Sequence, residues 1–178
     1  MIEKIIDIIG LPFIDYVPPK FDVSCMKQVY LAAEKSKDPS TKIGAVLVKE
    51  KNIICTGYNG FARKVLDLPE RYNNRELKYK YVAHAEDNVV LTCARLGIQS
   101  AGSILYTSAF PCAGCMNSII QGGIIKIIIH KQWPSMNERW SESQEISETM
   151  RKEAGIELEI LDEPLNMIGY FNGKMILV

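Results

Sequence analysis

The residues of this chain that could do chemistry are concentrated in two short stretches. YVAHAEDN, residues 81–88, contains His84, one of only two histidines. TSAFPCAGC, residues 107–115, contains Cys112 and Cys115, whose i, i+3 spacing puts both thiols on one side of a helix start. Unpaired N–H groups and the positive dipole end of a helix stabilise thiolates, the form that binds zinc. Taken alone, this cysteine pair fits a zinc site and a redox dithiol equally well.

The neighbourhood of His84 favours zinc. Both stretches follow apolar-rich segments and open predicted helices, and such junctions gather at one edge of a parallel α/β sheet. His84 can therefore meet Cys112 and Cys115, giving three ligands and an open fourth position, as in a catalytic zinc site. An open zinc lowers the pKa of a bound water, and Glu86 is placed to take that proton, or else to stabilise the helix dipole. H-x-E followed by P-C-x-x-C is the pattern of zinc nucleobase deaminases.

The bulk composition excludes several classes of protein. The 178 residues carry 21 basic and 21 acidic side chains, so the chain lacks the basic excess of a polynucleotide binder. The longest apolar run, residues 119–129, has about half the length needed to cross a bilayer. Five cysteines form an odd number, which does not suit a secreted disulfide framework. We expect a cytoplasmic protein with no membrane and no polynucleotide partner.

Strand and helix patterns alternate along the chain. They predict a three-layer α/β domain whose sheet begins with an antiparallel hairpin and continues in parallel. Residues 59–80 are predicted to form a long loop with a helical turn. We divide the chain into an N-terminal extension (1–20), a zinc-dependent deaminase domain (21–162) and a C-terminal tail (163–178). The predicted helices are 21–36, 85–96, 112–121 and 137–154, and the predicted strands are 43–48, 53–58, 103–108, 124–130 and 156–161.

Four segments, SKDPSTKIGAVLV, GYNGF, YVAHAEDN and FPCAGC, occur in the order found in the deoxycytidylate (dCMP) deaminase family. The chain resembles that family over about residues 21–160. The resemblance implies a cytidine deaminase-like fold, a five-stranded mixed sheet flanked by helices. It also implies one Zn²⁺ per chain on His84, Cys112 and Cys115, and hydrolysis of dCMP to dUMP and ammonia. Glu86 would pass protons from the attacking water to N3 of cytosine and to the leaving amine.

The resemblance also nominates residues that bind the substrate. Asn59 matches an asparagine that binds the sugar or base in related deaminases, although a turn residue before Gly60 is an alternative. Ser108, Ala109 and Phe110 match the strip that lines the base pocket. A monophosphate needs fixed positive charge, and we hypothesise that one or two cations of the 59–80 loop supply it: Arg63, Lys64, Arg71 and Arg75.

The family resemblance extends to assembly and regulation. Arg95 matches an arginine tied to nucleotide control in hexameric members that dCTP activates and dTTP inhibits. We therefore expect a homo-oligomer, a dimer or a hexamer, with dCTP and dTTP as effectors. The alternatives are a deaminase of another cytosine nucleotide or nucleoside or of tRNA adenosine, a non-catalytic zinc-stabilised nucleotide-binding subunit, and a redox dithiol protein. The presence of Glu86 argues against the last two, because neither gives that acid a role.

Overall fold

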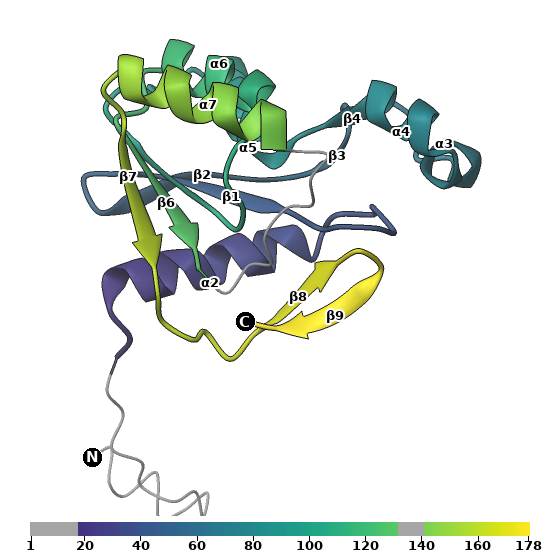
Figure 1. Cartoon of the computed structure of the whole chain (residues 1–178), viewed down its shortest axis with the longest axis horizontal. Coiled ribbons are helices and arrows are strands. Elements are labelled where there is room, and N and C mark those ends of the chain that lie inside the picture. Colours follow the sequence, from purple (N-terminus) through teal and green to yellow (C-terminus); the bar gives the residue numbers. More distant parts are fainter. Residues whose placement is uncertain (1–17, 132–140) are drawn as a thin grey trace, which may run out of the picture.

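The computed structural model describes residues 18–131 and 141–178 (Figure 1). Most of the predicted N-terminal extension and the first residues of the helix predicted at 137–154 lie outside these ranges. The described helices are α2 (Phe21–Ala33), α3 (Pro69–Asn73), α4 (Arg75–Tyr81), α5 (Ala85–Leu96), α6 (Ala113–Gln121) and α7 (Ser141–Glu153). None of the helices in the described ranges has the length and apolar character that spanning a membrane requires.

The central sheet has five strands in the order β2–β1–β5–β6–β7. β5, β6 and β7 pair in parallel, whereas β1 runs antiparallel to both β2 and β5. The predicted five-stranded mixed sheet is confirmed. The prediction that it continues in parallel directly from the hairpin is wrong at one point, because β1 lies between β2 and β5 and runs opposite to both. The strands are β1 (Gly44–Lys49), β2 (Asn52–Tyr58), β5 (Ile104–Thr107), β6 (Lys126–His130) and β7 (Glu157–Leu161).

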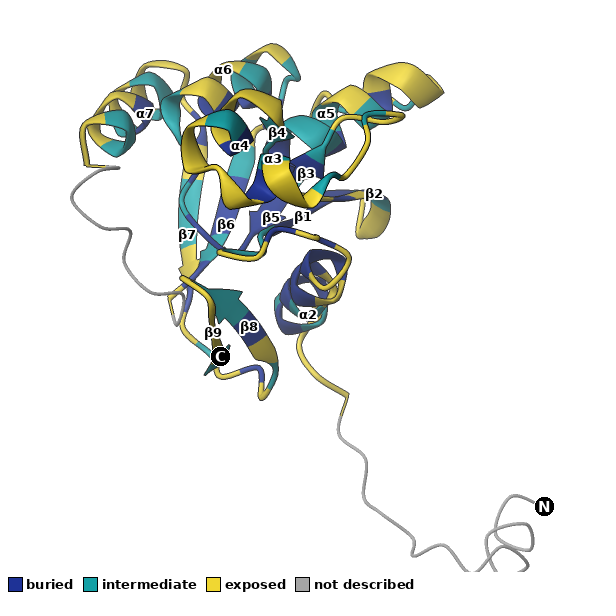
Figure 2. Cartoon of the chain, turned by 90° about the vertical axis from the view of Figure 1, so that its right-hand side faces the viewer, coloured by how far each residue is buried: buried dark blue, intermediate teal, exposed yellow. Residues whose placement is uncertain are grey.

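Helices cover both faces of this sheet, as the three-layer prediction requires. α2 packs on one face, and α5, α6 and α7 lie on the other (Figure 1). β1 divides its side chains between the two cores, with Val46 and Val48 on the α2 side and Ala45 and Leu47 on the α5 side. A strand covered on both faces reads as an unbroken apolar run, which explains the sequence of this segment. Figure 2 shows the buried residues concentrated along the sheet and on the helix faces that cover it.

Residues 59–80 are more ordered than predicted. They contain α3, which begins at Pro69, and α4, whose N-cap Asn74 accepts a hydrogen bond from the N–H of Leu77 at 3.0 Å. The Phe61 ring stacks on Tyr72 with centroids 4.1 Å apart and fixes α3 against the short strand pair β3 (Gly60–Phe61) and β4 (Val82–Ala83). The segment lacks a regular apolar stripe, so its sequence reads as a loop.

Residues 163–178, predicted as a tail, form a hairpin of β8 (Ile168–Phe171) and β9 (Lys174–Leu177). The hairpin lies beside α2 on the face of the sheet away from α5 (Figure 1). Its ends are anchored by Leu165 and Val178, which are 1% and 2% exposed and belong to the α2-side core. The hairpin is thus attached to the domain by core packing at its base.

His130 makes two hydrogen bonds inside the domain, and its neutral form satisfies both. Its Nε2 lies 3.0 Å from the Glu163 carbonyl oxygen, which can only accept, so Nε2 carries the proton. Nδ1 then accepts from the Tyr30 hydroxyl at 2.8 Å. Burial lowers the pKa of His130 below its ordinary value. At this position the unfolded chain therefore binds protons more readily than the folded chain in mildly acidic solution.

We expect the free energy of unfolding to fall as the pH drops through about 6.5, the ordinary pKa of histidine. His130→Gln can keep one of the two hydrogen bonds but cannot titrate. The variant should lose about 1 kcal/mol near pH 7.5 and show a shallower decline toward pH 5. Urea unfolding of the zinc-loaded proteins at several pH values measures this. Equal slopes for the two proteins would contradict the assignment.

Candidate active site

Two helix N-termini bring the predicted metal ligands together. His84 is the N-cap residue of α5 and Cys112 that of α6, and both have extended backbone with ψ of 160° and 169°. The approach of α5 to β2 is very close, since a Cβ on Gly57 would lie 2.9 Å from the Ala85 carbonyl oxygen. This glycine lets α5 sit low on the sheet, so that its first residues reach the start of α6.

The three ligand atoms have the separations that a tetrahedral zinc needs. The Sγ atoms of Cys112 and Cys115 are 3.6 Å apart, and they lie 3.5 Å and 3.3 Å from Nδ1 of His84. Zn–S bonds of about 2.3 Å and Zn–N bonds of about 2.0 Å give tetrahedral S···S and S···N separations of about 3.8 Å and about 3.5 Å. Two sulfurs and one nitrogen therefore fit zinc and leave one coordination position for a non-protein ligand.

The electrostatics of this cluster suit a metal. Hydrogen bonds from Cys115 and His84 lower the pKa of Cys112 to about 4, so this side chain is a thiolate at neutral pH. The hydrogen bond to Cys112 in turn raises the pKa of His84 to about 9. Zinc requires a neutral imidazole, so its binding would displace the His84 proton.

Glu86 lies beside the ligands, in the first turn of α5. It is 5% exposed, with Oε2 3.6 Å from Cys115 Sγ and Oε1 3.5 Å from the Thr107 hydroxyl. Burial raises the pKa of its carboxyl group. The carboxyl group of Glu86 thus lies within a few ångströms of the metal ligands. It holds a proton more readily than the carboxyl group of a glutamate exposed to water.

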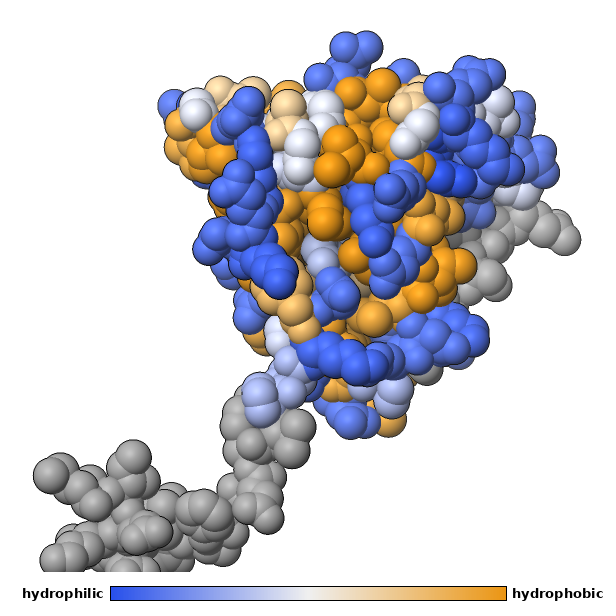
Figure 3. All heavy atoms as spheres, turned by 90° about the vertical axis from the view of Figure 1, so that its left-hand side faces the viewer, coloured by the Kyte–Doolittle hydropathy of each residue, from blue (hydrophilic) through white to orange (hydrophobic). Residues whose placement is uncertain are grey.

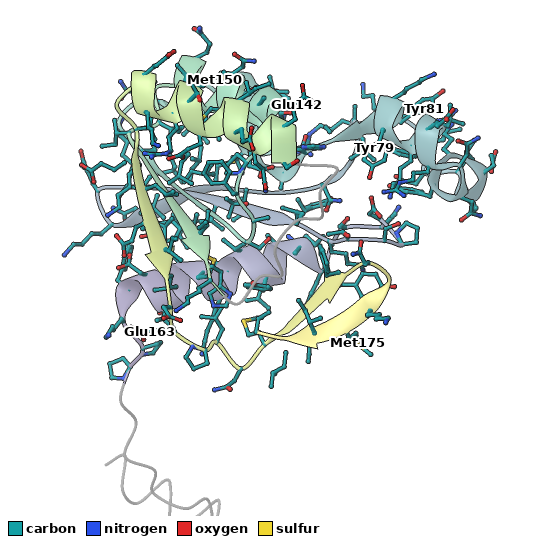
Figure 4. The ribbon with its side chains drawn as sticks, in the orientation of Figure 1. Tyr79, Tyr81, Glu142, Met150, Glu163 and Met175 are labelled. Atoms are coloured by element: carbon teal, nitrogen blue, oxygen red, sulfur yellow. The ribbon has the colours of Figure 1, made fainter. Side chains whose placement is uncertain are left out.

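A pocket of about 400 Å³ opens over this cluster. His84, Cys112 and Glu86 line one part of it, and Tyr79 lines another. Tyr79 extends from α4 (Figure 4). Four residues predicted to bind substrate line the pocket: Asn59, Arg75, Ala109 and Phe110. The others do not: Arg63, Lys64, Arg71 and Ser108.

Each of the remaining predicted residues has a defined place. Arg71 donates to the Leu66 carbonyl oxygen at 3.0 Å and covers the Tyr81 ring at 4.6 Å, so its charge is held away from the pocket. Ser108 is 1% exposed and packed beneath the pocket strip. Arg63 and Lys64 are exposed before α3. Arg95 is exposed in the last turn of α5, at the opposite end of the helix from the metal cluster.

Asn59 makes structural hydrogen bonds as well as lining the pocket. Its Oδ1 accepts from the Ile43 N–H at 2.8 Å, and its Nδ2 donates to the Thr41 carbonyl oxygen at 2.9 Å. These bonds tie the end of β2 to the segment before β1. One amide hydrogen and one acceptor position stay free of these bonds, so the side chain can still reach a ligand.

The sequence reasoning missed a buried ion pair in the pocket wall. Lys78 Nζ lies 3.0 Å from Asp38 Oδ1 and 3.2 Å from Ser40 Oγ, and both charged side chains are about 95% buried. Asp38 also accepts from the N–H groups of Ser40 and Thr41. The Asp38–Pro39–Ser40 turn signal was available in the sequence, but the pairing with Lys78 depends on α4, which was not predicted.

Comparison with known proteins places the chain in a family. The family model for the cytidine and deoxycytidylate deaminase zinc-binding region matches residues 19–131. The chain is 36% identical over 138 residues to an uncharacterized deaminase in the luxG 3′ region of Aliivibrio fischeri, covering 78% of this chain and 90% of the relative. It is 34% identical to the deoxycytidylate deaminase of Mus musculus, covering 70% and 76%.

The fold agrees with a solved structure. The dCMP deaminase of cyanophage S-TIM5, determined in complex with dCMP and dUMP, matches with a TM-score of 0.61 at 24% identity, over 82% of this chain and all of that one. The chain belongs to the cytidine and deoxycytidylate deaminase zinc-binding family. The predicted fold class and the zinc cofactor are thereby confirmed, and the redox dithiol alternative is wrong.

Proposed function

We propose that this protein hydrolyses dCMP to dUMP and ammonia. The observation that carries the proposal is the buried Glu86 carboxylate beside a three-ligand zinc site, in a pocket that also contains the cations Arg75 and Lys78. Several relatives of similar identity are named deoxycytidylate deaminases, including those of Mus musculus and Homo sapiens. Zinc activation of water, a shuttling acid and a phosphate anchor are what this reaction needs.

The residues divide the chemistry among themselves. When bound by His84, Cys112 and Cys115, zinc lowers the pKa of a water molecule in its open position. Glu86 accepts a proton from the water as the water oxygen bonds to C4 of cytosine, and donates to N3. It then passes the second proton to the exocyclic nitrogen as the C4–N bond breaks and ammonia leaves. The single carboxyl group of Glu86 can accept and donate protons in turn, because each donation returns it to the form that accepts the next proton.

The pocket wall positions the nucleotide. Phe110 and Ala109 form an apolar surface for the cytosine ring, and Asn59 offers its remaining amide hydrogen to the sugar. Arg75 is exposed and is the pocket cation that makes no ion pair within the described ranges, so it is the strongest candidate for the phosphate. Lys78 and Ser40 form a second polar group on the same wall. Of the four predicted phosphate cations, Arg75 is the one that lines the pocket, which supports this choice.

Ammonia release from dCMP, deoxycytidine, dCTP and cytosine, measured in parallel with the zinc-loaded protein, tests the substrate. We expect kcat/KM for dCMP to exceed that for deoxycytidine by about a hundredfold, because a charge-assisted phosphate contact contributes about 2–3 kcal/mol. Preference for another cytosine compound would leave the zinc chemistry in place and overturn the substrate. Bound zinc with no release from any of the four would favour the nucleotide-binding subunit.

We also propose a cytoplasmic homo-oligomer, a dimer or hexamer, that responds to dCTP and dTTP through the region of Arg95. Apolar side chains gather on the face shown in Figure 3. Large apolar side chains at least half exposed occur on α5, before β6 and on β7: Leu91, Leu96, Ile125 and Ile160. Leu91 and Leu96 flank Arg95 in the sequence, which supports an interface there. Light scattering gives the mass, and a monomer with or without dCTP would contradict this proposal.

A further inference from the structure

The C-terminal hairpin is bound to the pocket wall at its tip. The Lys42 N–H donates to the Tyr170 carbonyl oxygen at 3.0 Å, and the Gly173 N–H donates to that of Ser40 at 2.7 Å. The N–H of Asn172 donates to the Thr41 hydroxyl at 3.3 Å. With the core anchors at its base, these bonds fix the hairpin at both ends. The hairpin lies entirely outside residues 19–131, which carry the family match.

Ser40 connects the hairpin tip to the buried cation of the pocket. Its carbonyl oxygen accepts from Gly173 while its hydroxyl lies 3.2 Å from Lys78 Nζ. Phe171, Asn172 and Gly173 all line the pocket, as do the metal ligands His84 and Cys112. The tip therefore stands next to a polar wall made of Ser40, Lys78 and the Asp38 carboxylate that pairs with Lys78, in the same pocket as the cation Arg75.

The Asn172 side chain is available to a ligand. It is exposed, and it makes no hydrogen bond to any residue in the described ranges. Its backbone φ is 50°, and Gly173 follows with φ of 76°, the Asn-Gly turn of a two-residue hairpin. The turn fixes the backbone of Asn172 at the pocket rim, so its amide group can reach a ligand there as a hydrogen-bond donor.

We propose that the β8–β9 hairpin forms a wall of the substrate site and that the Asn172 amide recognises the 5′-phosphate of the nucleotide. The inference deepens the proposed function and rests on it for the choice of ligand. Asn172 acts as a specificity-determining residue: it separates nucleotides from nucleosides and takes no part in the proton transfers.

Asn172→Asp is the decisive variant. Aspartate has the size of asparagine and tolerates positive φ almost as well, so the turn is retained. The change replaces a donor by a negative charge, which should repel a phosphate and leave a nucleoside almost unaffected. Asn166→Asp is a matched control, because Asn166 is also exposed with positive φ (54°), lies in the same C-terminal segment, and does not line the pocket. Asn172→Gly, which keeps the turn and removes the amide, is a second variant.

Calorimetric titration of the zinc-loaded proteins with dUMP and deoxyuridine is the measurement, since these ligands are not turned over. We expect Asn172→Asp to raise the Kd of dUMP about tenfold and Asn172→Gly about threefold, with deoxyuridine changed less than twofold. Asn166→Asp should change neither Kd.

Equal losses for dUMP and deoxyuridine, no loss for either, or wild-type protein that does not bind dUMP would each overturn the phosphate role of Asn172. The outcome is separable from the proposed function. A wild type that binds dUMP but releases no ammonia from dCMP rejects the deaminase activity, and the titration of Asn172→Asp still decides the role of the hairpin.

Discussion

Glu86→Gln is expected to lower kcat for ammonia release from dCMP by about a thousandfold or more while zinc stays bound. The amide has the shape of the carboxyl group but cannot accept the water proton or hand one to the leaving amine. Glu86 is not among the three ligand atoms of the His84, Cys112 and Cys115 cluster, so the metal site should survive the change. The loss should fall on kcat, with the KM for dCMP changed only a few-fold.

Stopped-time ammonia assays with metal analysis of the same samples measure this. Glu34→Gln, the same change at an exposed acid at the end of α2, is the control and should retain full activity. Activity above about a tenth of wild type in the zinc-loaded Glu86 variant would rule out this carboxylate as the proton carrier. Loss of zinc from the variant would instead show that Glu86 supports the metal site.

The metal cluster could be predicted from the sequence because each ligand lies in a short motif at the start of a helix. His84, Cys112 and Cys115 stand at the first residues of two helices, and helix starts that follow strands meet at one sheet edge. Neither the sheet order nor the loop conformations had to be known to expect the three side chains to converge. Because β1 runs antiparallel to both β2 and β5, these two strands point the same way, and the end of β2 beside the start of α5 lies at the same edge as the end of β5.

The pocket wall could not be foreseen in the same way because it depends on contacts distant in sequence. The Lys78–Asp38 pair joins residues 40 positions apart, and the hairpin tip meets Thr41 across 131 positions. Local pattern carries no signal for such pairs. The Asn172–Gly173 turn was a readable hairpin signal, yet nothing in the sequence indicated that this hairpin would pack against the segment before β1.

The basic residues predicted to bind the phosphate could not be told apart from the sequence. Four basic residues of the 59–80 segment looked equivalent, and the structure separates them through packing of aromatic rings. Phe61 stacks on Tyr72, and the Arg71 guanidinium is drawn over Tyr81 and onto a carbonyl oxygen. Of these four, only Arg75 lines the pocket, to which α4 also brings Lys78. The sequence shows that basic residues are present in this segment, but the packing of its helices determines which of them lines the pocket.

Arg75→Ala is expected to raise the KM for dCMP by about ten- to a hundredfold, because a hydrogen bond to a charged group contributes about 1.5–3 kcal/mol. The KM for deoxycytidine should change less than twofold, since that substrate has no phosphate. Arg75 is exposed and its guanidinium lies 6.0 Å from the centroid of the Tyr79 ring, so its removal leaves no buried charge behind. Lys78 is a poorer site for this test, because truncating it would leave Asp38 buried without its partner.

Arg63→Ala is the matched control for that measurement. It removes the same charge from the same segment at an exposed position that does not line the pocket, so both KM values should stay within twofold of wild type. A rise in KM for both substrates in Arg75→Ala would mean that the arginine shapes the pocket as a whole. If the KM for dCMP also rises in Arg63→Ala, the summed positive charge of residues 59–80, and not a direct contact with Arg75, attracts the phosphate. Only a loss confined to Arg75 and to the phosphorylated substrate agrees with a direct contact.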